Sequence, residues 1–165
     1  MVIIYIASLT IANLFVAWFG PWFIPINAFV LIGLDLILRD KLHEKWGNNR
    51  LALRMLGMIA TAGAISYLVN QNAGMIAVAS TVAFMVAMAV DSLIYHKFRH
   101  LPWWKKANGS NIGGAAVDSV TFPTIAFGVL LPQIVLLQFI CKVVGGFVWS
   151  WAIDSLSRHT NNSKV

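Results

Sequence analysis

Charged side chains are scarce in this chain of 165 residues: only 11% are Asp, Glu, Lys or Arg, whereas 59% are hydrophobic. A soluble domain of this size carries roughly a quarter of its residues as charged ones. The chain therefore cannot cover its surface with polar groups in water. The composition excludes a soluble globular domain and predicts an integral membrane protein. The length allows one compact bundle and no separate soluble domain.

Cysteine and secretion signals are also nearly absent. Cys141 is the only cysteine, so no intrachain disulfide can form, and we interpret it as a small buried apolar residue. The first 20 residues have no basic segment and no clear small-residue cleavage site. They predict a retained first span instead of a signal peptide. The chain also lacks the G-x-x-x-x-G-K-[ST] loop, so any use of ATP would have to come from partners.

Long apolar runs are what the chain has in abundance. A transmembrane helix needs about 20 mainly apolar residues, with roughly 17–25 tolerated. Pro21, the polar run at 70–72 and Pro132 mark three tight turns, and longer polar connections lie at 39–50 and 96–111. We predict an all-α membrane protein, a compact bundle of six transmembrane helices. The six segments are 2–19, 22–38, 51–69, 74–95, 112–131 and 133–153.

The basic residues are confined to alternate connections. The second and fourth connections and the end of the chain carry them, whereas the first, third and fifth connections carry none. Lys and Arg collect on the cytoplasmic side, so both termini are expected inside (N-in/C-in). Contacts with anionic headgroups then account for the net charge of +6, and we expect no nucleic-acid partner. The predicted organisation is a transmembrane domain at 1–153 and a polar cytoplasmic tail at 154–165.

Four ionisable residues lie inside the predicted spans: Asp35, Asp91, Asp118 and Lys142. Each costs about 2.5–3.5 kcal/mol at a helix centre, and such groups usually face the bundle interior and mark a substrate or ion path. The alternative is a structural ion pair that only fixes packing. Asp118 and Lys142 lie fourteen residues before and ten after Pro132. On antiparallel neighbours their heights differ by about 6 Å, so we expect them to pair.

Polar side chains share helix faces with these charges, which predicts a wet central cavity. Small residues also form a packing stripe at Ala79, Ala83 and Ala87, and the next position is Asp91, which is therefore expected to face protein. Pro123 cannot donate to the Ser119 carbonyl, so we expect a broken helix beside Asp118. The four polar faces are Asn111, Ala115, Asp118 and Phe122; Gln138, Lys142, Gly145 and Trp149; Asn27, Leu31 and Asp35; and Thr10, Asn13 and Ala17.

The predicted cavity offers carboxylates, amides, one ammonium group and aromatic rings. A carboxylate can accept two parallel N–H bonds from an edge such as the N1–H and exocyclic NH₂ of guanine, and aromatic faces stack on flat bases. A neutral planar heterocycle therefore fits this set better than a metal ion or a sugar phosphate. We expect no metal and no cofactor.

Three motifs resemble the queuosine-precursor transporter family, also called the vitamin-uptake-transporter-like family. They are GLDLILRDKLHEKWG (33–47), IAVASTVAFMVAMAVDSLIY (76–95) and NGSNIGGAAVDSVTFPTIAFG (108–128), with QFICKVVGGFVW at 138–149. The resemblance covers about residues 5–151. It implies a six-helix importer of 7-deazaguanine bases, chiefly 7-cyano-7-deazaguanine, in the bacterial inner membrane. It also implies that the chain is not an enzyme, and it leaves the energy source, the exact base and a homodimer open.

The resemblance and the residues together suggest roles. Asp118 is expected to receive the donor edge of the base, helped by Asn111 and Gln138, while an aromatic ring stacks on it and Lys142 compensates the carboxylate when the site is empty. The longer branch of the family has an acidic residue where this chain has Arg39, which leaves the role of the 39–44 cluster open between a gate and a cytoplasmic cap. The expected binding residues are Asp118, Asn111, Lys142, Gln138, Ser110, Asn108, Phe122 and Trp149; the expected gating or ion-path residues are Asp35, Asp91, Arg39, Asp40 and Glu44.

Three other functions stay open at this point. The chain could be the substrate-binding subunit of a modular ATP-driven vitamin importer, because such subunits also have six helices and a similar size. It could be a membrane enzyme, since His96 and His100 have the i, i+4 spacing of metal ligands, although they lie in a basic loop before Pro102. The third alternative is a purely structural membrane protein.

Overall fold

The structure of the chain, a computed structural model, describes residues 1–35, 38, 42, 46, 50–98, 100 and 103–162, and their side chains except those of 51, 95, 103–108, 150 and 153–162. Within these residues every regular element is helical, which confirms the all-α class. The elements are α1 (Val2–Phe19), η1 (Pro21–Phe23), α2 (Ile24–Asn27), η2 (Ala28–Ile32), α4 (Leu51–Val69), η3 (Gln71–Ala73), α5 (Gly74–Lys97), α6 (Trp103–Phe127) and α7 (Pro132–Asn162).

Four helices in the described part of the chain are long and apolar enough to cross a membrane: Val2–Phe19, Ala52–Val69, Gln71–Ile94 and Pro132–Trp149. They match four of the six predicted spans. The predicted span at 22–38 begins within the shorter apolar helix Pro21–Asp35. The predicted span at 112–131 falls mostly within α6, which is 25 residues long but rich in polar residues. The count of six spans and the orientation stay predictions.

The distribution of side chains differs from that in a soluble protein. Large apolar side chains such as Ile3, Leu68 and Phe147 are exposed on the outside, whereas Asn13 and Gln138 are buried. Lipid can solvate an apolar exterior, and polar groups at membrane depth must find partners inside the protein. Together with the four apolar helices, this distribution indicates a multi-pass membrane protein.

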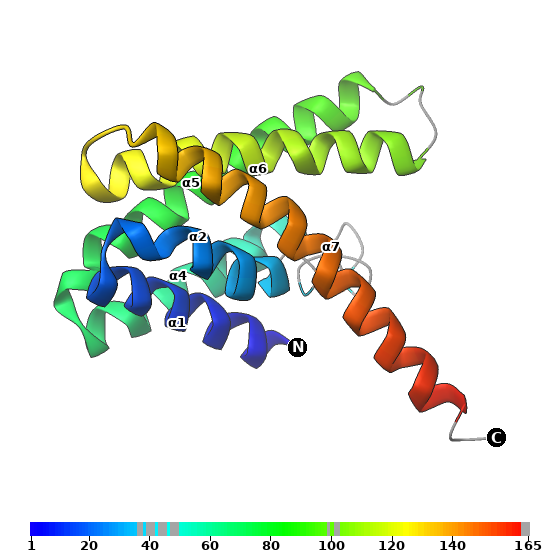
Figure 1. Cartoon of the computed structure of the whole chain (residues 1–165), viewed down its shortest axis with the longest axis horizontal. Coiled ribbons are helices and arrows are strands. Elements are labelled where there is room, and N and C mark those ends of the chain that lie inside the picture. The colour runs from blue at the N-terminus through cyan, green and yellow to red at the C-terminus, as the bar shows by residue number, and fades with distance from the viewer. Residues whose placement is uncertain are drawn as a thin grey trace.

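The last helix, α7, crosses two groups of helices: α5 with α6, and α1 with α2 and α4 (Figure 1). Helices α5 and α6 form an antiparallel pair, and α1 packs on α4, which packs in turn on α5. Helix α7 crosses the bundle, contacts α6, α2 and η2, and continues beyond the body of the molecule (Figure 1). Its helical backbone reaches Asn162, so it enters the range 154–165 that we expect to be a cytoplasmic tail.

A π-helical turn interrupts the second apolar segment. In η2 the Gly33 N–H donates to the carbonyl of Ala28, five residues earlier. This turn lies against α7 with no room for a side chain at the crossing. A Cβ added at Gly145 would lie 2.5 Å from the Phe29 carbonyl oxygen, and a Cβ added at Gly33 would lie 2.8 Å from the Gly145 carbonyl carbon. Both glycines are therefore needed for this close approach.

Helices α5 and α6 pack as the small-residue stripe predicts. Ala79, Ala83 and Ala87 are buried, and a Cβ added at Gly114 on α6 would lie 3.5 Å from the Cβ of Asp91. Asp91 therefore faces protein, as expected. The predicted break at Pro123 was wrong, because α6 remains helical through Pro123 to Phe127. Pro123 removes one hydrogen-bond donor, and the hydrogen bonds on either side keep the last turn helical.

Candidate binding site

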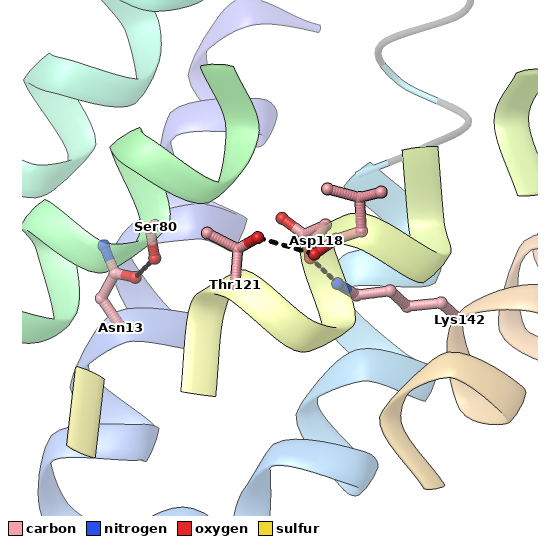
Figure 2. Close-up of polar contacts among 6 residues, drawn as sticks. Asn13, Ser80, Asp118, Thr121 and Lys142 are labelled. Atoms are coloured by element: carbon pink, nitrogen blue, oxygen red, sulfur yellow. Dashed lines mark hydrogen bonds and ion pairs between the residues drawn. The ribbon is translucent and has the colours of Figure 1, made fainter. Parts of the chain in front are cut away.

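The ion pair predicted between spans 5 and 6 is present. Lys142 on α7 donates from Nζ to Oδ2 of Asp118 on α6 (Figure 2). The Lys142 side chain is 4% exposed and the Asp118 side chain 23% exposed, so the lysine is buried while the aspartate stays partly accessible. Proline at position 132 starts α7, and the tight antiparallel connection brings the two residues to similar depth.

A first cavity lies beside this pair in the bundle interior. The volume that the centres of water molecules can occupy is about 80 Å³. About 10–15 Å³ of such volume holds one water, so several waters or a small ligand fit. Asp118, Phe122, Gln138 and Lys142 line it from α6 and α7. The other lining residues are Tyr5, Leu9, Ala12, Asn13, Ile24, Asn27, Ala28, Ile32, Asp35, Ile59, Ser80 and Phe84.

A second cavity adjoins the first on the side of the α5–α6 connection, with about 70 Å³ of the same kind of room. Asp91 lines it from α5 and Asn111 from α6. Five residues line both cavities: Ile32, Asp35, Phe84, Asp118 and Lys142. All four ionisable residues predicted inside the spans therefore meet around these two cavities, and the Asp118–Lys142 pair stands where the cavities adjoin.

Neutral hydrogen bonds hold the opposite wall of the first cavity. The Ser80 hydroxyl on α5 donates to Asn13 Oδ1 on α1 at 2.8 Å (Figure 2), and Asn13 Nδ2 reaches Ser66 Oγ on α4 at 3.4 Å. Ser66 in turn donates to the Ala62 carbonyl at 2.7 Å. These bonds tie α1, α4 and α5 together, so this wall is a cross-linked scaffold without ionised groups.

Two buried amide oxygens in the first cavity have no hydrogen-bond partner in the described part of the chain. They are Oδ1 of Asn27 and Oε1 of Gln138, and the two side chains are 6% and 3% exposed. A buried acceptor without a partner costs about 1–3 kcal/mol. The wall of the first cavity therefore carries two buried neutral acceptors with unused hydrogen-bonding capacity.

The structure brings together most of the predicted site residues, but not all. Phe122 and Gln138 line the first cavity and Asn111 the second. Ser110 is buried and lines neither. Trp149 also lines neither cavity, because its ring fills the space beside Gly33. The side chain of Asn108 and the residues Arg39, Asp40 and Glu44 lie outside the described part of the structure.

Sequence reasoning left several lining residues out of the predicted site. Asn27 was placed on a polar face without a binding role, and Tyr5, Ser80 and Phe84 were not considered. The lining positions of the second segment also differ from prediction: Ile32, not Leu31, lines the cavities with Asp35. The cause is the π-turn, which takes one more residue per hydrogen-bonded ring than an α-turn and so shifts which side chain faces inward.

The chemistry of the site follows from its charges. Asp35, Asp118 and Lys142 line both cavities. Asp91 and Asn111 add a third carboxylate and an amide to the second, whereas three amides, a serine hydroxyl and the Phe122 ring are added in the first. Such a site offers a planar ligand both an aromatic ring and hydrogen-bonding groups. Among the described residues no group of three His, Cys, Asp or Glu side chains comes together as a metal site.

Comparison with known proteins places the chain in a family. No curated protein and no solved structure matches the chain. Residues 1–154, nearly the whole chain, match the family described as "Putative vitamin uptake transporter". This match agrees with the apolar exterior, the membrane-spanning helices and the polar interior. The chain therefore belongs to this family of membrane transport proteins.

Proposed function

We propose that this chain imports 7-deazaguanine bases, chiefly 7-cyano-7-deazaguanine, across the bacterial inner membrane. The observation that carries the proposal is the pair of adjoining cavities inside an apolar bundle, with ionisable and amide side chains around them. The motif resemblance at 33–47, 76–95 and 108–128 supplies the substrate. In this proposal six helices cross the membrane with both termini in the cytoplasm.

The proposed mechanism begins with the base in the first cavity. Asp118 is held by Lys142 through one oxygen, and its partly exposed carboxylate faces the N–H edge of the base. Phe122, on the same helix one turn further, offers a ring face. Lys142 compensates the Asp118 charge when no base is bound, so the carboxylate is not left alone at membrane depth.

Release to the cytoplasm uses the second cavity. Asp35 and Asp91 line it with Asn111, and it lies on the side of the α5–α6 connection. We propose that rearrangement of the helix ends around these residues forms the inner gate, together with the Arg39–Asp40–Glu44 cluster. Carboxylates in this position can also bind and release protons, which would couple uptake to the proton gradient.

Uptake of labelled 7-cyano-7-deazaguanine tests the proposal in cells that lack both their own synthesis and their own importer. The wild-type chain is expected to restore uptake. Asp118→Asn is expected to lower it at least about tenfold, because a charge-assisted hydrogen bond of about 1.5–3 kcal/mol is lost. Each variant is compared at equal amounts of protein in the membrane. Normal uptake by Asp118→Asn would contradict the proposed role of the carboxylate.

Reconstitution separates the proposed carrier from a subunit of an ATP-driven importer. The purified chain in liposomes is expected to take up the base without ATP or a partner. Thermal unfolding in detergent against purines, deazapurines and vitamins identifies the ligand class, since a ligand that binds the folded state raises the melting temperature with its concentration. Stabilisation by a vitamin alone, with no uptake by the isolated chain, would favour the subunit.

A further inference from the structure

We propose that Asn27 and Gln138 are the residues that select the ligand by its N–H donors, through Asn27 Oδ1 and Gln138 Oε1. The inference deepens the proposed function, because it assigns ligand selectivity in the first cavity to two neutral amides. Both side chains line that cavity, and both oxygens are buried without a partner in the described part of the chain.

The orientation of the Asn27 amide is fixed by its neighbour. Its Nδ2 donates to the Ala12 carbonyl oxygen on α1 at 3.0 Å. A carbonyl oxygen can only accept, so the atom that faces Ala12 has to be the nitrogen. The oxygen is thereby the atom left for another donor. The hydrogen bond to α1 holds this acceptor in place before any ligand arrives.

The backbone brings the second acceptor close to the same wall. Helix α2 contacts α7, so Asn27 and Gln138 reach the cavity from neighbouring helices. Gln138 lies one turn before Lys142 on α7, which places its amide beside the ion pair. The two acceptors need two donors, and a ligand with only one N–H at this wall leaves one acceptor unsatisfied.

Neutral acceptors select ligands differently from a carboxylate. Asp118 is engaged with Lys142, and a carboxylate also attracts any cation. An amide oxygen has no net charge, so it attracts cations less than a carboxylate does and depends on a correctly placed N–H. A site built to hydrogen-bond a ligand group strongly rejects the analogue that lacks it, because buried polar groups are then left unpaired. The amides therefore favour neutral, donor-rich rings.

The test is a cycle of two variants of the full chain and two ligands. The ligands are 7-deazaguanine and 7-deazahypoxanthine, which lacks the exocyclic amino group, and binding is measured by thermal shift or calorimetry in detergent. Wild type is expected to prefer 7-deazaguanine about 10- to 100-fold, the equivalent of an unpaired buried acceptor. Gln138→Met, similar in length but without the amide oxygen, is expected to weaken binding of 7-deazaguanine by that factor and to leave binding of 7-deazahypoxanthine almost unchanged.

Asn27→Leu provides the second arm. This variant also loses the structural hydrogen bond to Ala12, but that loss weakens both ligands equally and cancels in their ratio. The exocyclic amino group has two N–H bonds, one for each acceptor, so the preference for 7-deazaguanine is expected to fall about tenfold or more in this variant too. Gln133→Met is the matched control: the same change on the same helix, at an exposed glutamine that does not line the cavity. It should leave both affinities as in wild type.

Equal weakening of both ligands in Gln138→Met and in Asn27→Leu would overturn the inference, because it would show a role in shape only. The same cycle is run with nicotinamide and N,N-dimethylnicotinamide. If the two variants lose a preference for nicotinamide over N,N-dimethylnicotinamide, and show no change with the deazapurines, the role of the two amide oxygens is supported. The proposal that the substrate is a deazaguanine is then contradicted. If neither pair binds to wild type, the two amides do not read donors on ligands of these classes, and the inference fails.

Discussion

The two adjoining cavities differ in what holds their walls together. The α1–α4–α5 wall of the first cavity is fastened by neutral hydrogen bonds among Asn13, Ser66 and Ser80. The second cavity is surrounded by three carboxylates and Lys142. Neutral groups at membrane depth stabilise once they are paired, whereas ionised groups carry a desolvation cost even when they are paired. We therefore assign the α1–α4–α5 wall a structural role, and the charged residues around the second cavity a functional one.

The largest effect is expected where the two cavities meet. Lys142→Met leaves the Asp118 carboxylate without its partner. Breaking a buried ion pair from one side costs about 3–5 kcal/mol, and we expect about 3 kcal/mol because Asp118 keeps 23% of its side-chain surface exposed. Thermal unfolding in detergent measures this loss.

The double variant Asp118→Asn/Lys142→Met is the control for that prediction. It removes both charges and is expected to recover most of the lost stability. An unchanged melting temperature in Lys142→Met alone would mean that the ion pair contributes nothing, and the contrast between the cavities would lose its main support.

The next effect concerns the crossing that supports both cavities. Gly145→Ala places a Cβ 2.5 Å from the Phe29 carbonyl oxygen, so α7 has to move off the π-turn. We expect a loss of about 1–3 kcal/mol, typical of overpacking, and reduced uptake. Gly57→Ala is the matched control, since nothing lies within 4 Å of its added Cβ. It should be neutral or stabilising by up to about 1 kcal/mol; equal losses in the two variants would contradict the close-crossing argument.

A smaller loss is expected in the neutral wall. Ser80→Ala removes the donor to Asn13 Oδ1 and should lower the free energy of unfolding by about 1 kcal/mol, with no change in the charge of the site. Ser92→Ala on the same helix is exposed and should stay within about 0.5 kcal/mol of wild type. Thermal unfolding of both variants, side by side, decides whether the Ser80 bond is specific.

The smallest expected change in stability is a gain instead of a loss. Asp91→Asn removes one of three carboxylates around the second cavity, and Oδ1 of Asp91 is buried without a partner in the described residues. We expect stability to stay level or rise by less than about 1 kcal/mol, while uptake falls, as happens when a charge is kept for function. Lower stability together with normal uptake would instead assign Asp91 to the scaffold.

The sequence allowed the charged part of the site to be predicted better than the neutral part. Asp118, Lys142 and Asp91 stand out because ionised residues are rare in apolar helices, and Pro132 sets the depth of the pair. The four helices of highest apolarity were also predicted correctly. In contrast, Tyr5, Ser80 and Phe84 are ordinary residues in a transmembrane helix, and nothing in their spacing marks them as lining a cavity.

Other differences have local physical causes. The predicted inward position of Leu31 assumed a regular helix, and the π-turn gives that place to Ile32. Trp149 was expected to stack on a ligand, but its ring packs beside Gly33 at the crossing. Backbone irregularities and close helix crossings depend on contacts between distant segments, which helical periodicity alone does not reveal.

The extra residue in the π-turn also matters for how such a chain can change. If the π-turn at Ala28–Ile32 changed to a regular α-turn with the chain length unchanged, the helix that follows would have to take up the extra residue. Every residue after the turn would then rotate by about 100° around the helix axis relative to Asn27. Asp35 would leave the face that it shares with Asn27, although neither residue had been replaced. Deleting one residue of the turn would have the opposite result: Asp35 would become the seventh residue after Asn27 in a regular α-helix and would stay on the same face.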